Sequence, residues 1–132
     1  MKVVLDTNVL LAGFATHGLC ETLIEICFQD HTVVISQHIL DELAEHYRSK
    51  FKASDEQIET VLSTLREHAE VVEPMVVPVQ AFADADDLPV LGTALAGQAT
   101  IIITGDKKLA GLGHYQGVEL LSPRQFYDRL AG

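Results

Sequence analysis

The sequence predicts an α/β fold in which a central, parallel sheet of about five strands is flanked by helices. Short apolar runs rich in β-branched residues alternate with longer stretches whose apolar residues recur at helical spacing. This alternation is typical of parallel strands joined by crossover helices that cover both faces of a sheet. The chain of 132 residues is long enough for one core and shows no break in composition, so residues 1–132 are expected to form a single domain.

Each expected strand is short and dominated by Val, Ile or Leu, which predicts strands buried on both faces. The five runs are Val3–Leu5, Thr32–Ile35, Ala69–Val72, Thr100–Ile103 and Val118–Leu121. The stretch 73–84, which contains two prolines, is expected to be the longest loop.

Helices are expected at 19–28, 37–51, 54–68, 87–98 and from Pro123 onward, since apolar residues recur there every three or four positions. Ser54 with Gln57 and Ser122 with Gln125 have the spacing of a capping box, which marks a helix start. The helices at 37–51 and 54–68 follow one another without a strand between them. They are therefore expected to form a helical hairpin that leans off the sheet.

Composition limits the possible functions. The net charge is −10, which disfavours a protein that binds nucleic acid through a basic surface alone. Cys20 and Cys27 are seven apart in an expected helix, about 10 Å, too far for a disulfide, so both are expected to be small core residues. No apolar stretch reaches the roughly 20 residues of a membrane span, and no signal peptide opens the chain, so a cytoplasmic protein is expected.

Two expected strands end in an aspartate, Asp6 after the first and Asp106 after the fourth. In open parallel sheets, ligands bind beyond the carboxyl ends of the strands, where the strand order reverses. Carboxylates that meet in one crevice repel each other unless a cation neutralises them, and oxygen-only ligands favour Mg²⁺ or Mn²⁺. These residues therefore predict a divalent-metal site.

Further acids can join this site. In a helical projection Glu42 lies at the edge of the apolar stripe of its helix, whereas Asp41 and Glu45 point away from it. Glu42 is therefore expected in the crevice, and its two acidic neighbours in solvent. Three more acids, Asp84, Asp86 and Asp87, precede a helix, where they can cap its N-terminus or enter the site.

The chain resembles the PIN-domain ribonucleases found as toxins in prokaryotic toxin–antitoxin modules. Four motifs carry the resemblance, in the family's order and over nearly the whole chain: a strand followed by Asp-Thr-Asn, a Ser with a Glu six positions later on a helix, an acidic run before a helix, and Thr-Gly-Asp after a strand. They lie at Val3–Leu10, Ile35–Leu43, Asp84–Ala96 and Ile103–Lys107. By the family's spacing, the acid of the third motif is Asp87, seven residues before Ala94.

The resemblance implies a three-layer PIN-like fold and a metal-dependent endoribonuclease that hydrolyses single-stranded RNA. It implies that Asp6, Glu42, Asp87 and Asp106 are both the catalytic residues and the ligands of Mg²⁺ or Mn²⁺, with Asp6 the central ligand. It also implies a protein antitoxin as partner and a homodimer. The chain adds one hint of a dimer, because Phe51, Tyr47 and the apolar positions of 54–68 exceed what a small sheet can cover.

Polar neighbours of these acids are candidates for orienting the carboxylates, or alternatively for tying strand ends and capping helices: Asn8, Ser36 and Thr104. Basic residues form two loose patches, at His46–Lys52 and at Lys107–Lys108, which either guide RNA phosphate or are simply solvated. His46 is expected at the surface or at the edge of the core rather than in the site.

Two other functions fit parts of the pattern. An Asp after the first strand is also found in phosphoacceptor and phosphatase folds, although the haloacid-type pattern needs a second Asp where this chain has Asn8. A non-enzymatic module with a degenerate acidic site that binds a protein partner is the other alternative.

Overall fold

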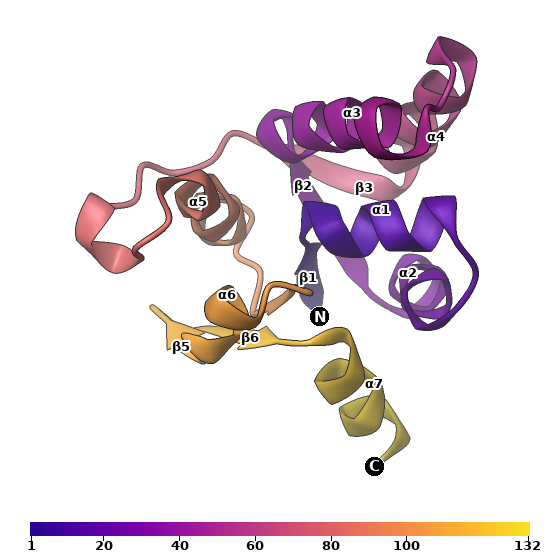
Figure 1. Ribbon diagram of the computed structural model, residues 1–132. Helices are drawn as coiled ribbons and strands as arrows, with labels where there is room; N and C mark the ends of the chain where they lie inside the picture. The colour runs from indigo at the N-terminus through magenta and orange to yellow at the C-terminus, as the bar shows by residue number, and fades with distance from the viewer.

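The computed structural model describes residues 1–132, which form one mixed, mostly parallel sheet flanked by helices (Figure 1). The sheet has the strand order β3-β2-β1-β4-β6-β5. All neighbouring strands are parallel except β5 and β6. The predicted α/β fold is confirmed, with six strands: β1 Lys2–Leu5, β2 Thr32–Ser36, β3 Ala69–Val72, β4 Ile101–Ile103, β5 His114–Tyr115 and β6 Val118–Leu121.

Six α-helices and two short 3-10 turns connect the strands, and a seventh helix, α7, follows the last strand. Figure 1 shows α5 on the opposite side of the sheet from α1 and α2. The helix bounds are α1 Thr7–Ala15, α2 Leu19–Asp30, α3 Gln37–Phe51, α4 Asp55–His68, α5 Leu88–Ala96, α6 Lys107–Gly111 and α7 Pro123–Ala131, and the 3-10 turns are η1 Val79–Ala81 and η2 Ala85–Asp87. All five predicted helices are present. Both predicted capping boxes form, one at Ser54 and Gln57, the other at Ser122 and Gln125.

Two helices and one strand were not predicted, and neither were the 3-10 turns η1 and η2. Helix α1 follows β1 with no intervening loop and is apolar on most sides, so it has no clear helical stripe. Helix α6 is only five residues long. Strand β5 has two residues and returns to β6 through Gln116 and Gly117, both with positive φ, as in a type I′ hairpin turn.

The environment of two predicted elements differs from expectation. β3 is an edge strand whose residues are exposed or half-buried, not a strand buried on both faces. The apolar residues of α4 are buried within the monomer: Ile58, Val61, Leu62 and Leu65. Of the surplus apolar surface expected on the hairpin, only Phe51 is exposed, with 45% of its surface open to solvent. The exposed apolar side chains concentrate instead in the segment after β3, where Val76 is 98% exposed.

The loop between β3 and α5 is anchored at one close backbone contact. The amide of Met75 donates to the carbonyl of Gly92 at 3.0 Å. A Cβ atom on Gly92 would lie 2.1 Å from the carbonyl oxygen of Met75, so any other residue would push the two segments apart. The contact fixes the start of the segment that carries the third acidic motif.

No single helix is long and apolar enough to cross a membrane; only α1 and α2, bent by 106° at the break between them, reach the needed length and hydropathy when taken together.

Candidate active site

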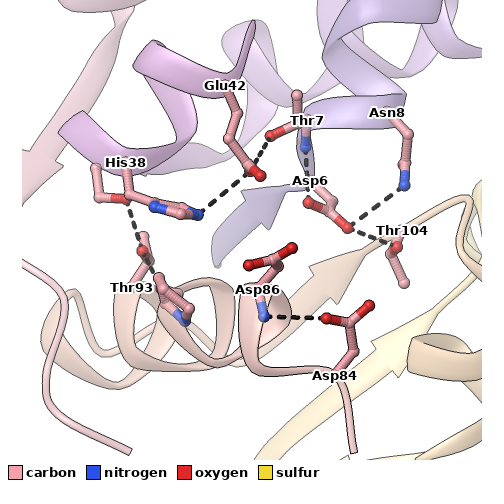
Figure 2. A network of polar contacts seen from close by, with 11 residues as sticks. Asp6, Thr7, Asn8, His38, Glu42, Asp84, Asp86, Thr93 and Thr104 are labelled. Carbon is pink, nitrogen blue, oxygen red and sulfur yellow. Dashed lines mark hydrogen bonds and ion pairs between the residues drawn. The ribbon is translucent and has the colours of Figure 1, made fainter. Parts of the chain in front are cut away.

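Four carboxylates approach one another at the carboxyl ends of the two central strands, β1 and β4. Figure 2 labels two of them, Asp6 and Glu42, which both accept hydrogen bonds from Thr7. Asp6 directly follows β1, and Asp106 lies three residues beyond the end of β4, its neighbour in the sheet. Glu42 is in the second turn of α3, and Asp87 immediately precedes α5. The predicted four acids are thus supplied by four separate parts of the chain. We call this set the acidic quartet.

Asp6 is the buried member of the acidic quartet, with 4% of its surface exposed. Its Oδ1 accepts from the amide of Thr7 at 2.8 Å, which caps α1, and its Oδ2 accepts from the hydroxyl of Thr104 at 2.8 Å and from Nδ2 of Asn8 at 3.5 Å. Burial raises the pKa of Asp6; the hydrogen bonds from Thr104 and Thr7 oppose this rise, and the charges of Glu42 and Asp106 add to it. Lone pairs on both oxygens remain for a ligand.

Thr104 and Asn8 fix the loop after β4, as the sequence suggested. The hydroxyl of Thr104 accepts from the amide of Asp106 at 3.1 Å while it donates to Asp6. The side-chain oxygen of Asn8 accepts from the amide of Gly105 at 2.8 Å. Asp106 itself caps α6, since its Oδ1 accepts from the amides of Lys108 and Leu109. Both polar residues therefore orient carboxylates and tie strand ends at once.

Glu42 faces the site, as its helical phase predicts. Its Oε1 accepts from the hydroxyl of Thr7 at 3.0 Å and lies 3.3 Å from Nε2 of His38, one turn earlier on α3. The approach of His38 has an ion-pair distance, but its geometry is not that of a hydrogen bond, and Nε2 is buried with no hydrogen-bond partner. Asp41 and Glu45 are exposed, as predicted.

Asp87 is the acid of the third motif that lines a cleft between α1 and α3. Its Oδ2 is buried and has no hydrogen-bond partner. Burial, followed by the charges of Asp6, Asp84, Asp106 and Glu42, raises the pKa of Asp87 to about 7. Asp84 and Asp86 are exposed, and the carboxylate of Asp84 accepts from the amide of Asp86 at 3.0 Å to cap η2.

Ser36 does not orient a carboxylate of the acidic quartet. Its buried hydroxyl pairs with the hydroxyl of Thr93 on α5 at 2.8 Å and makes no capping bond to α3. Both roles considered for Ser36 from the sequence are therefore wrong. Its partner lies 57 positions away in the chain, so sequence spacing gave no sign of this bond.

Thr7 and His38 are the neighbours of Glu42 that sequence reasoning missed. His38 is four residues before Glu42 and therefore on the same helical face, a signal that was available. Thr7 belongs to another element, so its bond to Glu42 depends on how α1 packs on α3. His46 was expected away from the site, but it lines the same cleft as Glu42.

A cleft of about 440 Å³ runs beside the acidic quartet between α1 and α3. Three members of the quartet line it, together with residues of both helices: Asp6, Glu42 and Asp87, then Thr7, Asn8, Leu11, Ala12, Thr16, His46, Lys50 and Phe51. The cleft is thus open to a ligand that also reaches the carboxylates.

The donor set fits a hard divalent cation. It consists of carboxylate oxygens, and the orphaned Oδ2 of Asp87 lacks any protein partner. As they stand, no three His, Cys, Asp or Glu side chains are grouped so as to hold a metal ion. Ionised carboxylates repel one another, so such a set is expected to draw together only around a cation. Mg²⁺ or Mn²⁺ would be held by Asp6, Asp87 and Asp106, with Glu42 at the edge.

The raised pKa of Asp87 predicts how the stability of the metal-free protein depends on pH. The folded state keeps this proton up to about pH 7, whereas the unfolded chain releases it near 3.8. The free energy of unfolding should therefore fall as pH rises from about 4 through 7, and the raised pKa of Asp6 acts in the same direction.

Urea denaturation with EDTA at pH 5 and at pH 8 measures how far the free energy of unfolding falls between these two values. The fall should be smaller in Asp87→Asn, because the asparagine side chain has no proton to release in this range. Equal pH dependence in the two proteins would show that Asp87 titrates normally.

Comparison with known proteins places the chain in a family. The family model of the PIN domain matches residues 2–108. The chain therefore belongs to the PIN domain family, which confirms the resemblance drawn from its motifs. A comparison with curated proteins finds no match.

Solved structures agree with this fold. The chain is similar to a chain in the crystal structure of VapBC2 from Rickettsia felis bound to a DNA fragment from its promoter. The TM-score is 0.65 and the sequence identity is 18%, over 92% of this chain and 98% of that chain. It is also similar to PAE2754 from Pyrobaculum aerophilum, with a TM-score of 0.66 and 15% identity, over 99% of this chain and 90% of that chain. At these identities the likeness concerns the fold.

Proposed function

We propose that this PIN-domain protein is a metal-dependent endoribonuclease that hydrolyses single-stranded RNA, and that it is a toxin neutralised by a cognate antitoxin. The observation that carries the nuclease proposal is the acidic quartet, with a buried Asp6 and an unpaired Oδ2 on Asp87. An uncompensated buried carboxylate is costly unless it has a ligand. Membership of a family whose members are typically nucleases gives independent support.

The residues of the site have distinct tasks in this proposal. Asp6 is held in place by Thr7 and Thr104, so one carboxylate is oriented before any ligand arrives. Glu42 is held by Thr7 at the edge of the cleft, where it can orient a water toward the phosphodiester. Bound Mg²⁺ or Mn²⁺ would supply charge neutralisation on the phosphoryl oxygens and activation of water.

The alternatives are less well supported. The haloacid-type phosphoacceptor pattern needs a second aspartate at position 8, where this chain has Asn8, whose side-chain oxygen accepts from the amide of Gly105. A degenerate binding module would have no use for the unpaired buried oxygen of Asp87.

The direct test uses the purified chain with Mg²⁺, Mn²⁺ or EDTA. We expect each cation to raise the melting temperature, because it binds the folded state and not the unfolded chain. We also expect an end-labelled, single-stranded RNA to be cut in the presence of the cation and to survive in EDTA. Intact RNA together with an unchanged melting temperature would contradict the proposal.

The antitoxin proposal is supported by the similar structure from Rickettsia felis, which is that of the VapBC2 assembly. The net charge of −10 suits a partner with a basic segment. Such a segment would lie across the cleft and compete with metal and RNA. The cognate partner should therefore lower cleavage when it binds; binding without inhibition would contradict this part.

The homodimer remains a proposal that comes from the family resemblance, because Phe51 is the one exposed apolar residue left of the surplus expected on the hairpin. Light scattering at micromolar concentration should give twice the chain mass of 14.4 kDa. A strictly monomeric mass would leave it without support.

A further inference from the structure

We propose that the far end of the cleft is a subsite for one nucleotide of single-stranded RNA, in which Lys50 binds a phosphate and Phe51 stacks on the base. This inference rests on the proposed function and assigns substrate-binding residues outside the acidic quartet. The subsite lies on the last two turns of α3 and faces α1.

The charge of the side chains that line the cleft changes along α3, from negative at Glu42 to positive at Lys50. Glu42, His46 and Lys50 are at positions i, i+4 and i+8, so they lie on one face of the helix, and all three line the cleft. Eight residues of helix span about 12 Å. A ligand that touches the carboxylates at one end can therefore reach the ammonium group of Lys50 at the other. A strand of RNA has a phosphate at each nucleotide and matches such an arrangement.

The structure separates the cations of the 46–52 patch. Arg48 does not line the cleft and pairs with Asp55 at 3.1 Å, and Lys52 ends the helix in the left-handed region with φ of 52°. Lys50 and His46 line the cleft and have no ion-pair partner within the protein. In a chain with a net charge of −10, a lysine without a carboxylate partner beside an acidic site is free to bind an anion.

Phe51 supplies the aromatic surface. It is 45% exposed and lines the cleft beside Lys50. Its ring meets that of Tyr47 edge to face, with centroids 6.3 Å apart and an interplanar angle of 69°. This contact restrains the ring and leaves part of it open to a ligand. An unpaired base can stack on such a ring, whereas a base inside a duplex cannot, so the subsite favours single strands.

The test measures cleavage of a short RNA by the full chain, with KM and kcat determined separately. Phe51→Ala should raise KM by about five- to a hundred-fold, the range expected when a base loses its stacking partner, and the effect should fall on KM rather than on kcat. Phe51→Trp should have a KM close to that of the wild type, because it keeps an aromatic ring on which the base can stack. Lys50→Gln should raise KM and lower the slope of log affinity against log salt by about 0.7 to 1, because one phosphate contact is lost.

Arg48→Gln is the matched control, because it removes the same charge from the same helix outside the cleft. It should leave KM and the salt slope unchanged. If Phe51→Ala and Lys50→Gln behave like Arg48→Gln while the wild type cleaves RNA, the subsite is wrong and the nuclease assignment stands.

Binding gives a second measurement that does not depend on cleavage. A single-stranded RNA carrying 2-aminopurine should lose fluorescence on wild-type protein and not on Phe51→Ala, while the same RNA in a duplex should be unaffected. This result supports the subsite even if no cleavage occurs, in which case the nuclease proposal alone has failed. No quenching by the wild type overturns the subsite. Displacement of the RNA by polyglutamate at equal concentration also overturns it, and would assign the cleft to an acidic peptide.

Discussion

The Asp6→Asn protein is expected to lose metal-dependent RNA cleavage by at least about 100-fold while it keeps its fold. Loss of a central ligand removes several kcal/mol of charge stabilisation in the transition state, and each 1.36 kcal/mol corresponds to a factor of ten in rate. The fold should survive because the asparagine side chain has the same shape and can still accept from the amide of Thr7. A neutral side chain also removes the cost of a buried charge, so the metal-free melting temperature at pH 8 is expected to rise.

Three measurements on this variant belong together: cleavage of end-labelled RNA, melting in EDTA, and the shift in melting temperature on addition of Mn²⁺. The shift should be smaller than in the wild type. Wild-type cleavage by Asp6→Asn would exclude a role for the acidic quartet in the reaction.

Glu42→Gln is expected to lower cleavage by about 10- to 100-fold, whereas Asp41→Asn should remain within about twofold of the wild type. The two residues are adjacent on α3 and each change removes one negative charge. Only Glu42 turns toward the site, where it accepts from Thr7; Asp41 is exposed and accepts from the side chain of Gln37 at 2.8 Å.

Comparing these two variants separates the effect of a carboxylate's position on cleavage from the effect of its charge. Single-turnover cleavage rates should be compared at equal Mg²⁺, with circular dichroism to confirm that both variants are folded. Equal rates in the two variants would mean that the contact of Glu42 with Thr7 has no part in cleavage.

Much of the fold could be predicted because its signals are local. Long helices such as α3 and α4 show their apolar stripe in the sequence, α4 also shows its capping box, and the strands next to β1 are short apolar runs. β5 could not be predicted, since two residues carry no period and its turn depends on a positive φ at Gln116. β3 has the composition of a buried strand, but its place at the edge of the sheet is decided by tertiary packing.

The candidate site was predicted to a similar extent. Asp6 and Asp106 follow strands, and Glu42 has a helical phase, so each could be placed from its own segment. The choice of Asp87 over Asp84 needed the family's spacing. Hydrogen-bond partners that are distant in sequence could not be predicted. Nothing near Ser36 in the sequence indicates Thr93, and nothing near Glu42 indicates Thr7.

The central place of β1 in the sheet also governs when the site can exist during folding. β1 pairs with β2 on one side and with β4 on the other, and the bond from Thr104 to Asp6 joins residues 98 positions apart. Contacts so distant in sequence close large loops, so they form late and slowly. A chain still being synthesised therefore has no assembled site until β4 has been made and has docked beside β1. Under the proposed function, hydrolytic activity would arise only with nearly the whole protein in place, which would leave time for the proposed antitoxin to bind the chain before RNA is cut.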